Sequence, residues 1–112
     1  MKRIIAIVRP EKLEPLKEAL FAADVNGMTV SQVNGCGNQH GWKEYFRGTE
    51  VILNMVPKVK FEIVAEDEEA DGICDVILQV AQTGEVGDGK IFISPVDEVI
   101  RIRTGERGNT AI

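Results

Sequence analysis

Three glycines and a lysine between residues 84 and 90 make this stretch of the sequence the one most suited to binding an anion. Glycine allows positive φ and lets a ligand approach the backbone closely. A run of exposed backbone N–H groups can form an anion-binding hollow, to which Lys90 would add a cation. The local alternative is a helix C-cap at Gly84 followed by a tight turn.

The same stretch fits only part of a P-loop. Gly84, Gly89 and Lys90 have the G-x-x-x-x-G-K spacing. Position 91 is Ile, however, where a P-loop needs Ser or Thr, and a strand-like pattern follows where a P-loop needs a helix. The sequence therefore predicts that a phosphate at this loop is held in a manner other than that of a P-loop.

A pair of arginines is the second candidate for phosphate chemistry. Arg101 and Arg103 lie two positions apart in a short predicted strand, Val99–Thr104, and so would share one face. Guanidinium groups bind phosphate through two charge-assisted hydrogen bonds. The alternative is an exposed polar strand face.

The remaining residues that could do chemistry are few. His40 is the single histidine, and the cysteines at 36 and 74 have no metal-like spacing, so a zinc site is not expected. Two cysteines that lie far apart in the sequence favour a reduced, cytoplasmic protein. A net charge of −5 argues against broad nucleic-acid binding. No apolar run approaches the length of a membrane span.

Hydrophobic periodicity predicts one domain over residues 1–112, with strands and helices in the order strand, helix, strand, long loop, strand, helix, strand. The expected ranges are a strand Lys2–Arg9, a helix Glu11–Asp24 stopped near Gly27, strands Met28–Gly35 and Pro57–Ala65, a helix Asp67–Gln82, a strand Lys90–Val96, the short strand Val99–Thr104 and a polar tail 105–112. This is the split β-α-β order of an α+β, ferredoxin-like fold with both helices on one face of the sheet. Because the first and fourth strands are apolar on both faces, we expect a symmetric oligomer to cover the second face.

The periodic pattern is lost between Gly35 and Met55, which predicts a functional loop. Its aromatic residues are suited to contacting a partner protein. The alternative is that they fold back on their own domain. These aromatic residues are Trp42, Tyr45 and Phe46.

The stretch Thr83-x-x-x-Gly87-Asp88-Gly89-Lys90-Ile91-Phe92 resembles the C-terminal signature of the PII nitrogen-regulatory signal transducers. The resemblance runs over essentially the whole chain. It includes Gly27-Met28-Thr29, Gly35-x-Gly37, Gln39, Tyr45 to Glu50, Pro57 to Lys60, Arg101 to Glu106 and Ala111-Ile112.

The resemblance implies a homotrimer with nucleotide sites in the clefts between subunits. These sites would bind ATP or ADP and, with magnesium-ATP, also 2-oxoglutarate. Gln39 would hold Mg²⁺, and Lys58 would pair with the distal carboxylate of 2-oxoglutarate. The implied nucleotide-binding residues are Gly27, Met28, Thr29, Gly35, Cys36, Gly37, Asn38, Gln39, Glu62, Val64, Gly87, Asp88, Gly89, Lys90, Arg101 and Arg103.

The resemblance also implies a regulator of carbon and nitrogen status whose loop 37–55 docks on a target, such as an ammonium transporter or an enzyme of nitrogen metabolism. The implied target contacts are Trp42, Tyr45, Phe46, Arg47 and Thr49. Contact with a membrane would be only indirect, through a transporter.

Four positions depart from the family pattern: Asn38, His40, Thr49 and Val51. Asn38 stands where relatives often have an arginine that contacts the terminal phosphate, and Val51 stands where enterobacterial-type members carry a uridylylated tyrosine. Val51 has no hydroxyl, so no uridylylation is expected there.

Two other function classes compete with the regulator. The first is a small phosphate-handling enzyme, which ferredoxin-like folds also host, although no Ser-His-Asp or Cys-His set is visible. The second is a trimeric metal-tolerance-type protein of similar architecture, which lacks support because His and Cys are not clustered.

Overall fold

The structure is a computed structural model, which describes residues 1–36, 42–46, 49–53 and 55–112. Four antiparallel strands form one sheet in the order β2-β5-β1-β6, and a separate two-stranded sheet joins β3 to β4. The element bounds are β1 Lys2–Val8, η1 Pro10–Lys12, α1 Leu13–Ala22, β2 Thr29–Gly35, β3 Trp42–Phe46, β4 Thr49–Leu53, β5 Val56–Ala65, α2 Asp67–Ala81, β6 Gly89–Pro95 and η2 Gly108–Ala111.

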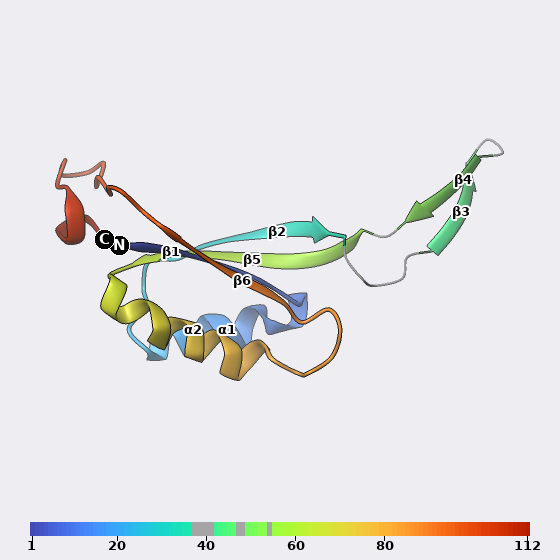
Figure 1. The fold of residues 1–112 in the computed structure, drawn as a ribbon, viewed down its shortest axis with the longest axis horizontal. Helices are drawn as coiled ribbons and strands as arrows, with labels where there is room; N and C mark the ends of the chain where they lie inside the picture. Colours follow the sequence, from blue (N-terminus) through green and yellow to red (C-terminus); the bar gives the residue numbers. More distant parts are fainter. Residues whose placement is uncertain (37–41, 47–48, 54) are drawn as a thin grey trace.

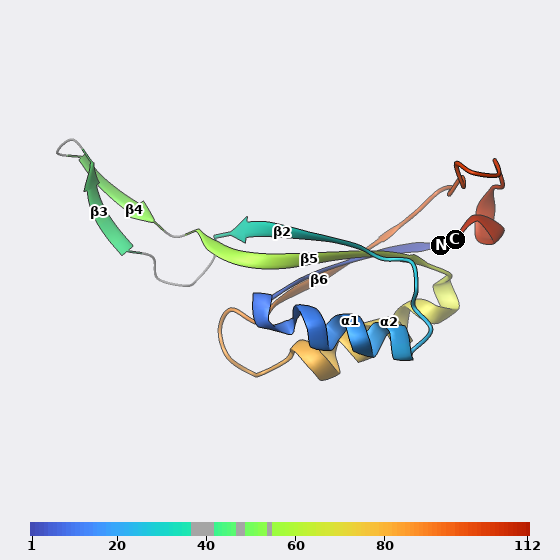
Figure 2. The same ribbon diagram turned by 180° about the vertical axis from the view of Figure 1, so that it is seen from behind.

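This arrangement confirms the predicted α+β, ferredoxin-like fold. Both helices lie on the same side of the four-stranded sheet, as the front and back views agree (Figures 1 and 2). The chain termini lie close together at one end of the sheet, and the β3–β4 hairpin extends beyond the other end (Figure 1). No helix in the described part of the chain is long and apolar enough to cross a membrane.

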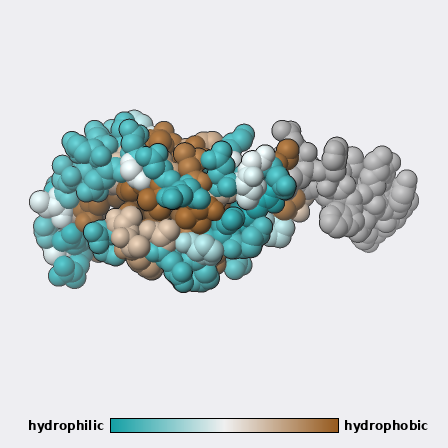
Figure 3. All heavy atoms as spheres, turned by 90° about the horizontal axis from the view of Figure 1, so that it is seen from below, coloured by the Kyte–Doolittle hydropathy of each residue, from teal (hydrophilic) through white to brown (hydrophobic). Residues whose placement is uncertain are grey.

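The core lies between the sheet and the two helices, and the alternation along β5 explains why. Val59, Phe61 and Ile63 are at most 2% exposed, whereas Lys60 and Glu62 between them point to the open face. Buried residues of the first strand and of both helices complete this core: Ile4, Ala6, Val8, Leu16, Leu20, Ile73 and Ile77. The helix side also carries an apolar area surrounded by hydrophilic side chains (Figure 3).

Three predicted features differ from the structure at segment ends. The first helical turn, Pro10–Lys12, is a 3-10 turn, because Pro15 has no N–H to donate to the preceding turn. Helix α1 ends at Ala22 instead of continuing to Asp24. Asp24, with φ 63°, takes the left-handed position after the helix, so Gly27 is not its stop.

The predicted strand Val99–Thr104 is wrong. Residues 102–104 form a turn, and only an isolated bridge joins Ile100 to Arg107. The backbone here bonds to itself: Gly105 N donates to Arg101 O at 2.7 Å, and Arg101 N donates to Glu106 O at 2.9 Å. The loop 35–55, predicted without regular structure, contains the β3–β4 pairing Trp42–Phe46 with Thr49–Leu53.

Candidate functional site

The glycine loop between α2 and β6 is a separate turn with positive-φ glycines, and not a cap of helix α2. Helix α2 ends at Ala81, and the following Gln82 already has extended backbone with ψ 120°. Gly84, Gly87 and Gly89 have φ of 89°, 100° and 108°, the region that L side chains rarely adopt. The predicted alternative of a C-cap at Gly84 is therefore wrong, and the loop leads directly into a strand, as the mismatch with a P-loop indicated.

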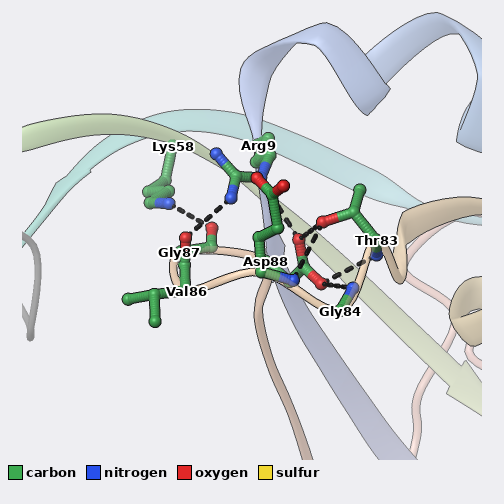
Figure 4. A network of polar contacts seen from close by, with 8 residues as sticks. Arg9, Lys58, Thr83, Gly84, Val86, Gly87 and Asp88 are labelled. Atoms are coloured by element: carbon green, nitrogen blue, oxygen red, sulfur yellow. Dashed lines mark hydrogen bonds and ion pairs between the residues drawn. The ribbon is translucent and has the colours of Figure 1, made fainter.

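Asp88 organises this loop from within. Its carboxylate accepts hydrogen bonds from the Thr83 backbone N–H at 2.7 Å, the Gly84 N–H at 2.9 Å and the Thr83 hydroxyl (Figure 4). The hydroxyl of Thr83 is the largest cause of a strongly lowered pKa of Asp88, followed by the backbone N–H of the same residue. The carboxylate is therefore ionised at neutral pH, and its acceptors are used in shaping the turn.

Two cations hold the loop from the neighbouring strands. Arg9 Nε lies 3.3 Å from Asp88 Oδ1, and Arg9 Nη2 donates to the Val86 carbonyl at 2.7 Å. Lys58 Nζ donates to the Gly87 carbonyl at 2.6 Å (Figure 4). Sequence reasoning did not single out Arg9. Its position directly after Val8 places it beside the glycine loop, because Val8 pairs with Gly89 in the sheet.

Lys58 has the properties of a site for an anionic ligand. Its side chain is shielded, at 8% exposure, and its ammonium donates to the neutral carbonyl of Gly87. A largely buried ammonium whose bonded partner is a neutral carbonyl keeps donors and charge for a second acceptor. Gly35 lies beside it, because a Cβ built there would sit 3.5 Å from Lys58 Cγ. Cys36 follows and is exposed.

A second group of predicted nucleotide residues lies toward the opposite end of the sheet. Thr29 pairs with Glu62 between β2 and β5. Glu62 lies 3.0 Å from the Lys60 ammonium, and this hydrogen bond is the main cause of the lowered pKa of Glu62. A hollow of about 670 Å³ nearby is lined by residues that include Gly27, Val64 and the C-terminal Ile112. Met28 packs against the core.

Arg101 and Arg103 also lie beyond this end of the sheet, but not as a pair on a strand. Arg101 Nη1 lies 3.2 Å from Glu106 Oε1, and its Nη2 donates to the Thr110 carbonyl at 2.9 Å. Arg103 lies in the turn and is exposed. The prediction that they project from the same strand face is wrong, because the turn replaces the strand.

One chain does not bring the two groups together. Lys90 lies at the first end of β6, whereas Arg101 follows its last residue, Pro95, by six positions. The seven residues of β6 alone span roughly 20 Å at the rise of a strand. The structure therefore contains two half-sites, one at each end of the sheet. We call them the Gly89 end (Arg9, Gly35, Cys36, Lys58 and residues 83–90) and the Arg101 end (residues 27–29, Glu62, Val64, Arg101 and Arg103).

Some predicted residues fall outside the described part. Gly37, Asn38 and Gln39 are not described at all, nor is Arg47. Trp42, Tyr45, Phe46 and Thr49 are described only as backbone positions in β3 and β4. Within the ranges that are described, no cluster of three potential metal-binding side chains occurs.

The architecture and the glycine loop agree with a comparison against protein families: the model of the nitrogen regulatory protein P-II family matches residues 1–106. The chain belongs to this family. It is 55% identical over 112 residues to nitrogen regulatory protein P-II 2 of Methanothermobacter thermautotrophicus, covering 100% of this chain and 97% of that protein. It is 52% identical to nitrogen regulatory protein P-II of Microchaete diplosiphon and 49% identical to that of Azospirillum brasilense, each over the full length of both chains.

Family membership supports the sequence-based identification of a regulatory protein. The relatives carry the names of regulators and not of enzymes. Ligands, targets and assembly are matters of proposal, and the geometry of the two half-sites is the basis for them.

Proposed function

We propose that this chain is a nitrogen-status signal transducer that binds ATP or ADP in clefts between three copies of itself. With magnesium-ATP bound, the same cleft takes 2-oxoglutarate, and the loop 37–55 then regulates a target protein. Each cleft uses the Gly89 end of one copy and the Arg101 end of the next.

The separation of the two half-sites carries this proposal. Lys90 favours phosphate at one end, and the two arginines favour it at the other. Because roughly 20 Å of strand separates them within one chain, a single phosphate chain reaches both only across a contact between copies. A head-to-tail contact of this kind closes into a ring when its rotation permits, and three copies are the expected ring.

The open face of the sheet also favours an assembly. Ile5 pairs with Phe92 across β1 and β6 on the side away from the helices, and Phe92 is 52% exposed. Ile7 lies on the same face and is half-buried. Apolar side chains on a sheet face without helices are stabilised when another subunit covers them.

Lys58 supports the assignment of 2-oxoglutarate to the Gly89 end. A dicarboxylate offers one carboxylate to Lys58 and the other to Mg²⁺, for which the amide oxygen of Gln39 and the ATP phosphates are suitable ligands. ATP and 2-oxoglutarate that share a metal ion raise each other's affinity by the same factor, because binding coupling is reciprocal. ADP lacks the terminal phosphate and is not expected to support 2-oxoglutarate.

The β3–β4 hairpin is the proposed contact for targets. It extends away from the sheet (Figure 1). The strands that flank the loop 37–55 pair at Gly35 and Val56, which lie at the Gly89 end. A ligand at Lys58 and Gln39 would therefore act at the base of this segment. An ammonium transporter or an enzyme of nitrogen metabolism is the expected class of partner.

Light scattering and calorimetry on the full chain test the proposal together. We expect a mass of three chains, ATP and ADP binding at one site per chain, and 2-oxoglutarate binding with magnesium-ATP but not with ADP. A monomer that binds ATP would contradict the shared cleft. Steady ATP turnover without a target would favour the phosphate-handling enzyme instead. A pull-down from cell extract with and without 2-oxoglutarate and ATP identifies the target.

A further inference from the structure

The last fourteen residues fold back on themselves at the Arg101 end. Gly108 N donates to the Val99 carbonyl at 3.0 Å, and Ile100 bridges Arg107. Gly105 and Gly108 have φ of 73° and 77°, which lets the chain reverse twice within a short length. The C-terminal tail, residues 105–112, is therefore an ordered part of this half-site.

This tail engages the phosphate-binding groups of Arg101. Nη1 is paired with Glu106 at 3.2 Å, and Nη2 donates to the Thr110 carbonyl at 2.9 Å. A guanidinium that grips phosphate in a bidentate manner uses the same terminal nitrogens. Tail and phosphate thus require the same donors.

The end of the tail is anchored beside the other predicted nucleotide residues. Ala111 is 8% exposed, and Ile112 lines the hollow that Gly27 and Val64 also line. The tail therefore contacts Arg101 with one part and shares a hollow with Gly27 and Val64, two of the predicted nucleotide-binding residues, with another.

We propose that the C-terminal tail is a built-in competitor of the nucleotide, in which the Glu106 carboxylate and the Thr110 carbonyl occupy Arg101 until phosphate displaces them. The inference rests on the proposed nucleotide function of the Arg101 end. Because ATP must displace the tail from Arg101, the observed affinity for ATP is lower than the affinity of the same cleft without the tail contacts. Shortening or neutralising the tail then tightens nucleotide binding without any change in the cleft.

Replacing Glu106 tests this competition in the full-length protein. Glu106→Gln removes the charge that opposes phosphate while keeping a side chain of the same size. Because the pair is half-exposed, we expect ATP affinity to rise between about 1.5-fold and fivefold, the range of an exposed ion pair. Calorimetric titration with ATP measures the change.

Two matched variants make the result specific. Glu98→Gln breaks the 2.6 Å ion pair with Arg107 in the same segment but leaves both acceptors of Arg101 in place, so ATP affinity should not change. In an Arg101→Ala background, Glu106→Gln should not raise the ATP affinity, because the guanidinium that Glu106 occupies is already absent.

Different results overturn different claims. If wild-type protein binds ATP but Glu106→Gln binds it equally or more weakly, the competition is refuted while the nucleotide site stands. An equal gain in Glu98→Gln, or a gain that persists without Arg101, refutes it as well. If wild-type protein binds no ATP, the proposed function itself fails.

Discussion

The two ends of the sheet differ in how their charged groups are held. At the Gly89 end, Arg9 directly follows strand β1 and Lys58 lies in β5, and both fix the glycine loop by side-chain contacts to positions 86–88. At the Arg101 end, the arginines lie on a turn outside the sheet, and Arg101 bonds only to its own tail among the described residues. The cations of the first half-site are therefore part of the folded framework, whereas the arginines of the second lie on a peripheral segment.

This difference predicts different consequences of substitution. Changes at the Gly89 end should affect folding stability as well as ligand binding, because the loop and the strand pairing share the same residues. Changes of Arg101 or Arg103 should affect ligand binding alone, because the segment that carries these two arginines lies outside the sheet and its core. The following experiments test the contrast, beginning with the largest expected effect.

Gly89→Ala should be the most damaging change. Gly89 has φ 108°, and a Cβ there would lie 1.7 Å from the Ile7 carbonyl oxygen, which belongs to the β1 backbone and cannot move without disturbing the sheet. We expect a loss of about 3 kcal/mol or more in unfolding free energy from backbone strain and overpacking together. Urea unfolding at a fixed protein concentration measures it.

Gly84→Ala is the matched control for that experiment. Its φ is 89°, but a Cβ there meets no atom within 4 Å, so only the backbone term remains, about 1 kcal/mol. Equal losses in the two variants would show that close packing of Gly89 against β1 does not matter.

Lys58→Met should remove 2-oxoglutarate binding. It takes away the shielded ammonium that we assign to the distal carboxylate, and losing such a partner costs about 2–5 kcal/mol, or at least roughly thirtyfold in affinity. ATP affinity should change much less, because Lys90, Arg101 and Arg103 are retained. Calorimetry with magnesium-ATP present measures both ligands.

Lys60→Met supplies the control on the same strand, β5. Lys60 pairs with Glu62 at 3.0 Å and lies outside the Gly89 end, so 2-oxoglutarate affinity should be unchanged. Unaltered 2-oxoglutarate binding in Lys58→Met would mean that the ligand is assigned to the wrong residue even though the fold is right.

The Asp88 network should be insensitive to pH over the range in which cells operate. Hydrogen bonds from Thr83 and Gly84 lower the pKa of Asp88 below its ordinary 3.8, so their stabilising effect is fully present above pH 4. It is lost only as pH falls through the lowered folded-state pKa. The amide proton shifts of Thr83 and Gly84 should therefore stay constant from pH 8 to pH 5. A pH-dependent change of both amide shifts between these values would contradict the assigned hydrogen bonds. Asp88→Ala should abolish the hydrogen-bond network itself.

Bound nucleotide should slow the alkylation of Cys36 but not that of Cys74. This is a smaller effect than those of the substitutions above. Cys36 is exposed at the Gly89 end, next to the proposed phosphate site. Burial is the main cause of a raised pKa of Cys74, with Asp71 and Asp75 adding to it, so that thiol should react slowly with or without ATP. Mass spectrometry of the two peptides after brief alkylation gives both rates. Equal labelling of Cys36 with and without ATP would place the nucleotide elsewhere.

Much of the framework was predictable because it follows from local periodicity. The alternation of Val59, Phe61 and Ile63 with charged neighbours is enough to assign the core face of β5. The glycines at 84, 87 and 89 likewise indicated a turn with positive φ. These signals lie within a few residues of the features that they specify.

The errors and omissions depend on contacts that hydrophobic periodicity does not encode. Arg9 and Asp88 are 79 positions apart, so nothing near either residue indicated their ion pair. The pattern of Val99–Thr104 is strand-like, but a strand needs a partner, and the backbone of this segment bonds to its own tail instead. The same reason explains why Arg101 could be chosen as a phosphate group from sequence whereas its acceptors Glu106 and Thr110 could not.

The position of the half-sites at opposite ends of one sheet has a consequence for inheritance. In the proposed ring of three copies, a gene carrying Lys90→Ala and a second gene carrying Arg101→Ala would each encode a protein whose clefts are all defective. Expressed together, they would form mixed rings in which about a quarter of the clefts join an intact Gly89 end to an intact Arg101 end. Two recessive alleles of this gene would then complement each other in the same cell, whereas two alleles that damage the same end would not.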